Sequence, residues 1–208
     1  MIVVEPVIEL PGRRDFGLWP VAEAEPFSFM ALDGTLTPDQ VGTAVMALAV
    51  CNEGEPDDDG PPCPADPLGR FLHGLLTVDS PEVPGGLRVT DTQSGVRFVP
   101  GCCCGLEDRG DWLDVLDGDG RAAWFGHDPS PGAERRGDVV RLTVDAEADP
   151  GSGRWIDVPA RELRRLLAGA ERDLAGFLDL AARWAATSLP AHCAPVGRAL
   201  GRALRVRA

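Results

Sequence analysis

The chain of 208 residues lacks lysine and tyrosine altogether and contains only three histidines. All 20 basic residues are therefore arginine, a bias that is typical of a GC-rich genome. The longest apolar run, at residues 41–51, is too short to cross a membrane. Residues 1–10 have no basic segment before their apolar run, so they do not resemble a secretory signal. We expect a cytoplasmic protein whose six cysteines are reduced thiols.

The motifs of common enzyme classes are also missing. There is no G-x-S-x-G nucleophile elbow and no glycine-rich phosphate-binding loop. The segment LDGTLT at residues 32–37 resembles half of the haloacid dehalogenase phosphatase motif. However, Ala31 stands where that family has its nucleophilic aspartate, so we take the match as coincidence. These absences favour a protein that is not an enzyme, and leave open a hydrolase that uses His127 with neighbouring carboxylates.

The net charge of −13 is unevenly distributed along the chain. Residues 151–208 hold ten arginines and five acids, so residues 1–150 carry a charge of −18. Such a field repels nucleic acid phosphates and anionic membranes and attracts basic partners. We therefore expect a basic protein partner and no nucleic acid or membrane partner, although solubility alone also explains an acidic surface.

Local patterns predict a mixture of strands and helices. Thr37, Pro38 and Gln40 form a helix start with a capping box, and an apolar helix face continues to residue 50. Apolar side chains recur at helical spacing over residues 159–189, where Gly169 leaves open a division into two helices. The remaining predicted elements are strands at 2–10, 87–92, 96–100, 122–125, 139–144 and 154–158, and helices at 67–76 and 194–206.

The order of these elements defines the expected fold. No β-α-β rhythm runs through the strands, which favours antiparallel or mixed pairing. Residues 52–67 are rich in proline and acid, so they are expected to form a surface loop rather than a domain boundary. The sequence predicts a single α+β domain over residues 1–208, with an antiparallel or mixed sheet packed against a long C-terminal helical segment at residues 159–206.

Residues 101–131 concentrate the reactive side chains, beginning with Cys102, Cys103 and Cys104. This run lacks the paired C-x2-C spacing of most zinc sites, and the favoured interpretation is small apolar side chains that close a turn, with no cofactor. The alternative is a zinc or reactive thiol site. Because adjacent side chains of an extended chain point in opposite directions, only Cys102 and Cys104 are expected to share an ion. The candidates to complete its coordination are His127, Cys51, Cys63 and His192.

An acidic helix is expected at residues 106–116. Glu107, Asp111 and Asp114 would lie on one face of this helix, opposite its leucines and Trp112. A ridge of carboxylates binds cations or arginine-rich partners, although a solvated helix face is commoner. We predict that a basic partner contacts these three carboxylates and the acidic run formed by Asp57, Asp58 and Asp59.

The pattern PGCCCGLE at residues 100–107, with Trp112 and with WFGHDP at residues 124–129, resembles one that recurs in small bacterial proteins of uncharacterised activity. The resemblance implies a small bacterial domain and no particular activity. The predicted function is a cytoplasmic, non-enzymatic interaction module whose acidic surface docks a basic partner, of an immunity or regulatory type. The alternative is a metal- or thiol-site protein that uses Cys102, Cys104 and His127, with zinc as the cofactor.

Overall fold

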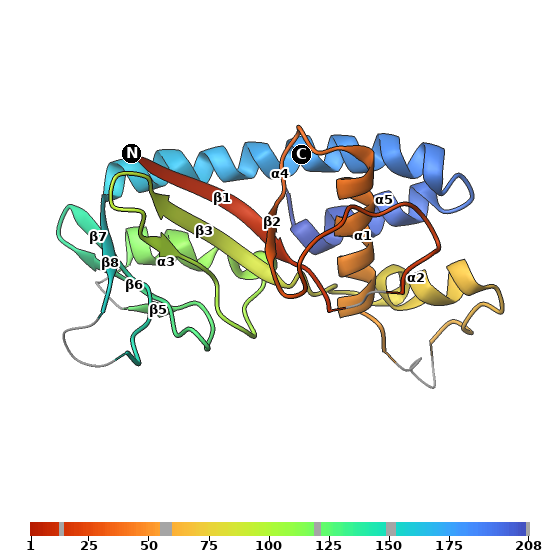
Figure 1. Ribbon diagram of the computed structural model, residues 1–208, viewed down its shortest axis with the longest axis horizontal. Helices are drawn as coiled ribbons and strands as arrows, with labels where there is room; N and C mark the ends of the chain where they lie inside the picture. The colour runs from red at the N-terminus through yellow and green to blue at the C-terminus, as the bar shows by residue number, and fades with distance from the viewer. Residues whose placement is uncertain (13–14, 55–59, 119–121, 149–152, 207–208) are drawn as a thin grey trace. The chain divides into compact units, whose positions relative to one another are not determined.

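The computed structural model describes residues 1–12, 15–54, 60–118, 122–148 and 153–206. These residues form two antiparallel sheets and five α-helices (Figure 1), so the predicted α+β class is confirmed. In chain order the elements are β1 (Ile2–Glu9), β2 (Phe29–Ala31), α1 (Pro38–Cys51), α2 (Pro67–Thr77), β3 (Gly85–Asp91), β4 (Arg97–Phe98), η1 (Leu106–Asp108), α3 (Asp111–Asp117), β5 (Ala123–Trp124), β6 (Gly132–Arg136), β7 (Val139–Thr143), β8 (Trp155–Pro159), α4 (Ala160–Ser188) and α5 (Cys193–Leu204).

The chain divides into two compact units. The first unit contains Met1–Val7 and Gly85–Asp173, and the second contains Ile8–Pro84 and Leu174–Ala208. β1 and α4 each begin in the first unit and end in the second. The expectation of one domain stays a prediction. Within the described ranges, no helix combines the length and the apolar character that crossing a membrane requires.

In the first unit, β5, β6, β7 and β8 form an antiparallel sheet in sequence order. Ala133, Leu142 and Ile156 are partners in one row across this sheet, and all three are buried. The sequence did not predict β6, since its residues Gly-Ala-Glu-Arg-Arg are poor strand formers. β6 forms because β5 and β7 pair with its two edges.

The other sheet has the strand order β2-β1-β3-β4. β3 and β4 pair antiparallel, as the expected hairpin, and Gly95 in their turn has a φ of 72° that suits glycine. The Thr92 N–H donates to the Met1 carbonyl at 3.0 Å, which holds the start of β1 beside the end of β3. This sheet carries β4, from which the chain continues into the cysteine run.

In the second unit, α1 begins as the sequence predicts. The Gln40 N–H donates to the Thr37 hydroxyl at 3.3 Å, and the Thr37 N–H donates to the Gln40 side chain at 2.9 Å. Residues 41–49 of this helix are all buried.

Arg202 of α5 donates to the Leu76 carbonyl at 3.3 Å, where it pairs an orphan acceptor at the end of α2. The predicted helices at 67–76 and 194–206 are thus present with small shifts of their ends.

A helix break at Gly169, which the sequence left open, does not occur, and one helix that was expected to be continuous is split. α4 runs unbroken through Gly169, because the cost of one glycine, about 1 kcal/mol, is small beside the burial of Leu163, Leu174 and Phe177 on one side of the helix. The expected helix at 106–116 is instead split into η1 and α3. At the split, the Leu106 carbonyl accepts from the Arg109 guanidinium at 3.0 Å and from the Arg109 N–H at 3.3 Å.

Candidate metal centre

The cysteine run lies against the chain that follows β5. The Cys102 N–H donates to the His127 carbonyl at 2.7 Å, and the His127 N–H donates to the Cys102 carbonyl at 3.2 Å. These two bonds form an isolated antiparallel bridge. The Gly101 N–H adds a bond of 2.8 Å to the Phe125 carbonyl. The backbone therefore places Cys102 and His127 directly opposite each other.

Two glycines permit this close approach. A Cβ atom on Gly126 would lie 2.5 Å from the carbonyl carbon of Gly101, and one on Gly101 would collide with the Pro129 carbonyl oxygen. Gly126 also has a φ of 102°, which residues with a side chain rarely adopt. The bridge between Cys102 and His127 thus depends on both glycines.

The backbone at Cys103 brings two thiols to the same side of the chain. Cys103 has a left-handed φ of 63°, and its sulfur lies 3.5 Å from that of Cys102. One ligand atom each from Cys102, Cys103 and His127 lies within 4.8 Å of the other two, and the described residues contain no second group of this kind. Both cysteines are exposed, and the His127 side chain is 46% exposed. Dissolved ions can reach all three.

The structure groups Cys102 with Cys103 and His127, whereas the sequence suggested Cys102 with Cys104. That expectation assumed an extended chain, whereas the left-handed turn at Cys103 selects Cys103 as the neighbour of Cys102. Cys104 is half-buried and lines a separate small hollow with Pro100 and Trp112. Burial and the negative charge of Asp108 raise the pKa of the Cys104 thiol to about 11. Of the three cysteines in the run, only Cys104 fits the predicted role of a small apolar side chain that closes a turn, because Cys102 and Cys103 are exposed.

Polar and aromatic neighbours surround the imidazole of His127. Its Nδ1 lies 3.3 Å from Oδ2 of Asp128. The Trp124 ring stacks on it at 27°, with 6.3 Å between the ring centroids. Trp124 is itself held by a 3.0 Å bond from its Nε1 to the hydroxyl of Ser130, which is buried. These contacts restrict the orientation of the imidazole.

An aromatic cluster fixes the segments that carry the site. The Trp112 ring stacks on Phe125 with 4.5 Å between centroids, and Phe98 meets the edges of both rings at 5.4 Å and 5.9 Å. All three side chains are buried. Phe98 lies in β4 just before the cysteine run, and Phe125 lies two residues before His127. This packing anchors both halves of the site.

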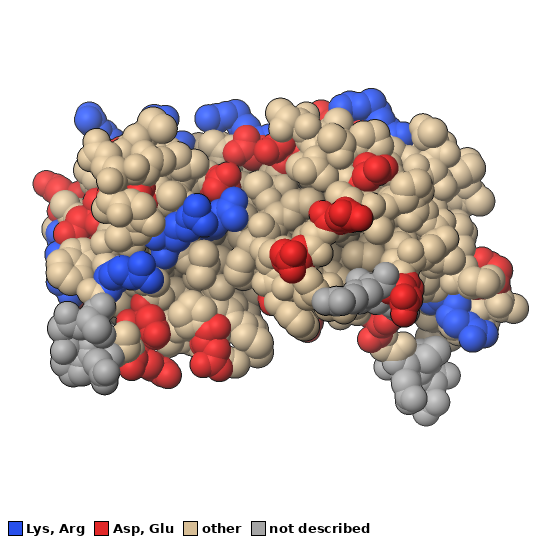
Figure 2. Space-filling model, in the orientation of Figure 1, with Lys and Arg blue, Asp and Glu red and all other residues tan. Residues whose placement is uncertain are grey.

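The carboxylates predicted to contact a partner do not form one helix face. Glu107 belongs to η1, whereas Asp111 and Asp114 are exposed on α3. Burial and the charges of Asp108 and Asp114 raise the pKa of Asp111. The acidic run Asp57, Asp58 and Asp59 lies outside the described residues. On the face seen in Figure 2, acidic side chains occur in small separate groups.

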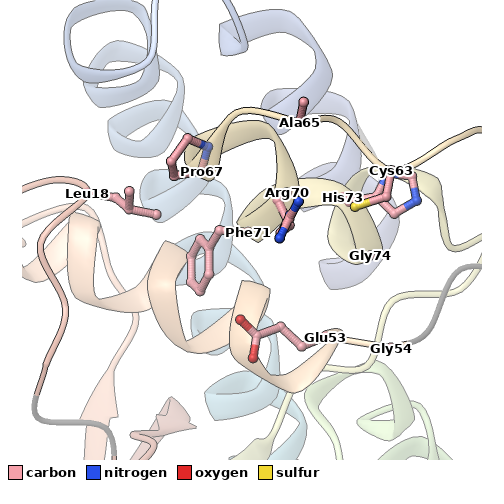
Figure 3. A pocket seen from close by; sticks show the side chains of 10 residues that line it. All are labelled: Leu18, Glu53, Gly54, Cys63, Ala65, Pro67, Arg70, Phe71, His73 and Gly74. Atoms are coloured by element: carbon pink, nitrogen blue, oxygen red, sulfur yellow. The ribbon is translucent and has the colours of Figure 1, made fainter.

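The second unit contains a hollow of about 530 Å³ (Figure 3). Its lining includes Cys63, Arg70, Phe71 and His73, mostly from α2, and His73 is buried. Neither Cys63 nor His73 belongs to a group of three potential metal ligands among the described residues. The hollow therefore does not have the donor set seen at Cys102, Cys103 and His127.

No protein-family model matches the chain, and neither a curated protein nor a solved structure matches it. What the site binds must therefore be inferred from its own chemistry.

Proposed function

We propose that the protein binds a thiophilic metal ion, Zn²⁺ in the first instance, through Cys102, Cys103 and His127. The proposal rests on one observation: the three ligand atoms of these residues all lie within 4.8 Å of one another. Around tetrahedral zinc with Zn–S bonds of about 2.3 Å, two sulfurs lie about 3.8 Å apart. The sulfurs of Cys102 and Cys103 are 3.5 Å apart, so small side-chain rotations suffice to seat an ion between them.

The donor types favour a soft or borderline ion. Thiolate and imidazole ligands suit Zn²⁺ and Cu⁺, whereas Mg²⁺ and Ca²⁺ prefer oxygen ligands. Both thiols lose their protons when they bind, so two thiolates balance the charge of one Zn²⁺ ion. The charge balance between two thiolates and one Zn²⁺ ion therefore supports zinc binding at this exposed site.

Asp128 supports the role of His127. A histidine that ligates a metal usually donates its second N–H to a carboxylate or a carbonyl, which fixes the ring. The 3.3 Å contact between Nδ1 of His127 and Asp128 fits this arrangement and leaves Nε2 for the ion. Asp128 is then a positioning residue rather than a ligand.

Three protein ligands leave one position of a tetrahedral ion for water or a small ligand. Structural zinc sites usually have four protein ligands, whereas sites with three keep an open position. The exposure of both cysteines agrees with an open site. The proposed function is therefore to hold an accessible, exchangeable metal ion rather than to stabilise the fold with it.

Zinc titration of the metal-free protein against a chromophoric chelator tests this function. We expect about one zinc ion per chain, with affinity at least tenfold lower in each of Cys102→Ser, Cys103→Ser and His127→Gln, since even the loss of a supporting residue costs about 10- to 100-fold. Cys104→Ser is the matched control and should bind like the wild type. The proposal is refuted if the wild type binds no zinc, or if Cys104→Ser weakens binding as much as Cys103→Ser.

The docking of a basic protein partner, of an immunity or regulatory type, is the second candidate function. The observation that favours it concerns Asp111, whose pKa is raised by burial first and then by repulsion from the negative charges of Asp108 and Asp114. A cationic partner would relieve that repulsion and would be attracted by the charge of −18 over residues 1–150.

Calorimetric titration with an arginine-rich peptide tests this second candidate. We expect binding that weakens as salt is added and that falls several-fold in Asp111→Asn/Asp114→Asn. The double variant Asp15→Asn/Asp79→Asn removes the same charge elsewhere and should bind like the wild type. If both double variants lose the same affinity for the peptide, the binding depends on net charge and not on contacts with Asp111 and Asp114.

A further inference from the structure

Cys102 and Cys103 are adjacent in sequence, yet their sulfurs face each other. The left-handed φ of 63° at Cys103 places the two sulfurs 3.5 Å apart, and both side chains are exposed. Dissolved oxidants and reductants can therefore reach two thiols whose sulfurs are in contact, although a disulfide requires them to approach to about 2.05 Å.

We propose that Cys102 and Cys103 are a reversible redox pair, and that their oxidation by a peroxide to a disulfide releases the metal ion. The release, but not the oxidation itself, rests on the metal-binding function proposed above. The metal-bound state and the disulfide state exclude each other. Metal binding needs two thiolates, and the disulfide has none.

The reaction with hydrogen peroxide balances in two steps. One thiolate attacks a peroxide oxygen, the O–O bond breaks, and a sulfenic acid forms with release of hydroxide, which becomes water. The second thiolate attacks that sulfur, the S–O bond breaks, and a second hydroxide leaves and becomes water. Two thiols lose two electrons and two protons in total, and one peroxide is reduced to two waters.

The geometry of adjacent cysteines makes the disulfide easy to reverse. Consecutive Cα atoms lie about 3.8 Å apart, whereas the Cα atoms of most disulfides are about 4.4 to 6.8 Å apart. A bond between neighbours is therefore strained, and strained, exposed disulfides are the more readily reduced ones. This property suits a switch rather than a structural crosslink.

The third cysteine of the run is poorly placed to compete. Cys104 is half-buried and lines the small hollow beside Trp112, and it is not part of the group formed by Cys102, Cys103 and His127. The remaining cysteines, Cys51, Cys63 and Cys193, are not part of this group either. Oxidation should therefore pair Cys102 with Cys103 selectively.

Mild peroxide treatment of the metal-free protein, followed by thiol alkylation and peptide mass analysis, tests the pairing. We expect two of the six thiols to be lost, one disulfide within the peptide that holds Cys102 and Cys103, and full recovery with dithiothreitol. Cys104→Ser should form the same disulfide, whereas Cys102→Ser and Cys103→Ser should not. A bond to Cys104, or no loss of paired thiols, overturns the proposal.

His127→Gln and zinc titration of the oxidised protein separate this inference from the metal-binding function. His127→Gln should still form the disulfide while it binds zinc at least tenfold more weakly. Oxidised wild type should lose zinc binding and regain it on reduction. If the disulfide forms but the reduced protein binds no zinc, the metal function fails and the redox pair stands. If oxidised protein still binds zinc, the proposed release is wrong.

Discussion

Cys102 and His127 exchange two backbone hydrogen bonds, of 2.7 Å and 3.2 Å, across an isolated bridge between distant parts of the sequence. The positions of the two ligands are thus set by the main chain, and their side chains only complete the arrangement. Any change that separates the two backbones should weaken the site without touching a ligand.

Gly126→Ala should therefore destabilise the protein and weaken zinc binding together. The new Cβ would lie 2.5 Å from the carbonyl carbon of Gly101, at a φ of 102° that alanine rarely adopts. We expect a loss of about 2 kcal/mol or more, from backbone strain and overpacking. Urea unfolding of the metal-free protein measures the loss, and the chelator titration measures zinc.

Gly110→Ala is the control for that change. A Cβ atom on Gly110 meets nothing within 4 Å, and its φ of −57° suits alanine. This variant should keep wild-type stability and zinc affinity. If Gly126→Ala behaves in the same way, the bridge does not need the close approach of Gly101 and Gly126.

Gly176→Ala and Gly169→Ala should have different effects, although both lie inside α4. Replacing a helical glycine by alanine usually stabilises a helix by about 1 kcal/mol. A Cβ on Gly169 has only the end of the Arg172 side chain near it, at 3.8 Å, so this gain should be realised. A Cβ on Gly176 would lie 3.0 Å from the Cα of Gly34. We expect Gly176→Ala to be at least about 1 kcal/mol less stable than Gly169→Ala in urea unfolding.

Equal stability of these two glycine variants would show that the backbone around Gly34 moves aside without cost. That result would contradict a tight contact between Gly34 and Gly176 within the second unit.

The ion pair between Arg141 and Asp157 should make stability depend on pH. Nε of Arg141 donates to Asp157 at 2.8 Å across β7 and β8, and this bond lowers the pKa of Asp157. A carboxylate whose pKa is lowered by folding adds stability above its unfolded pKa, about 3.9, and loses it as the pH falls through the lower folded value. Asp157→Asn should lower the melting temperature at pH 7, and the difference should shrink below about pH 4.

A double-mutant cycle with Arg141→Gln provides the control for this pH effect. If the pair is responsible, Asp157→Asn should have little effect on melting in the Arg141→Gln background at any pH. If Asp157→Asn lowers the melting temperature just as much in the Arg141→Gln background, another contact of Asp157 is responsible.

Local sequence determined much of the secondary structure. Thr37 and Gln40 are three residues apart and make the predicted capping box, because both partners lie within one helical turn. The β3–β4 hairpin and the long helix α4 also follow from short-range patterns, a glycine turn in one case and a continuous apolar stripe in the other. The sequence therefore sufficed for the α+β class.

Only the tertiary structure decided the composition of the site. β6 exists because two neighbouring strands pair with it, and the helix split at Arg109 accompanies its ion pair with Glu171. The choice of Cys103 over Cys104 depends on the left-handed turn, and the approach of His127 depends on the contact of Gly101 with Gly126. The glycines on either side of the cysteine run were the only hint in the sequence that the chain is not extended there. The ion pair of Arg109 with Glu171 and the bridge of Cys102 with His127 join residues far apart in sequence, and spacing along the chain does not encode such contacts.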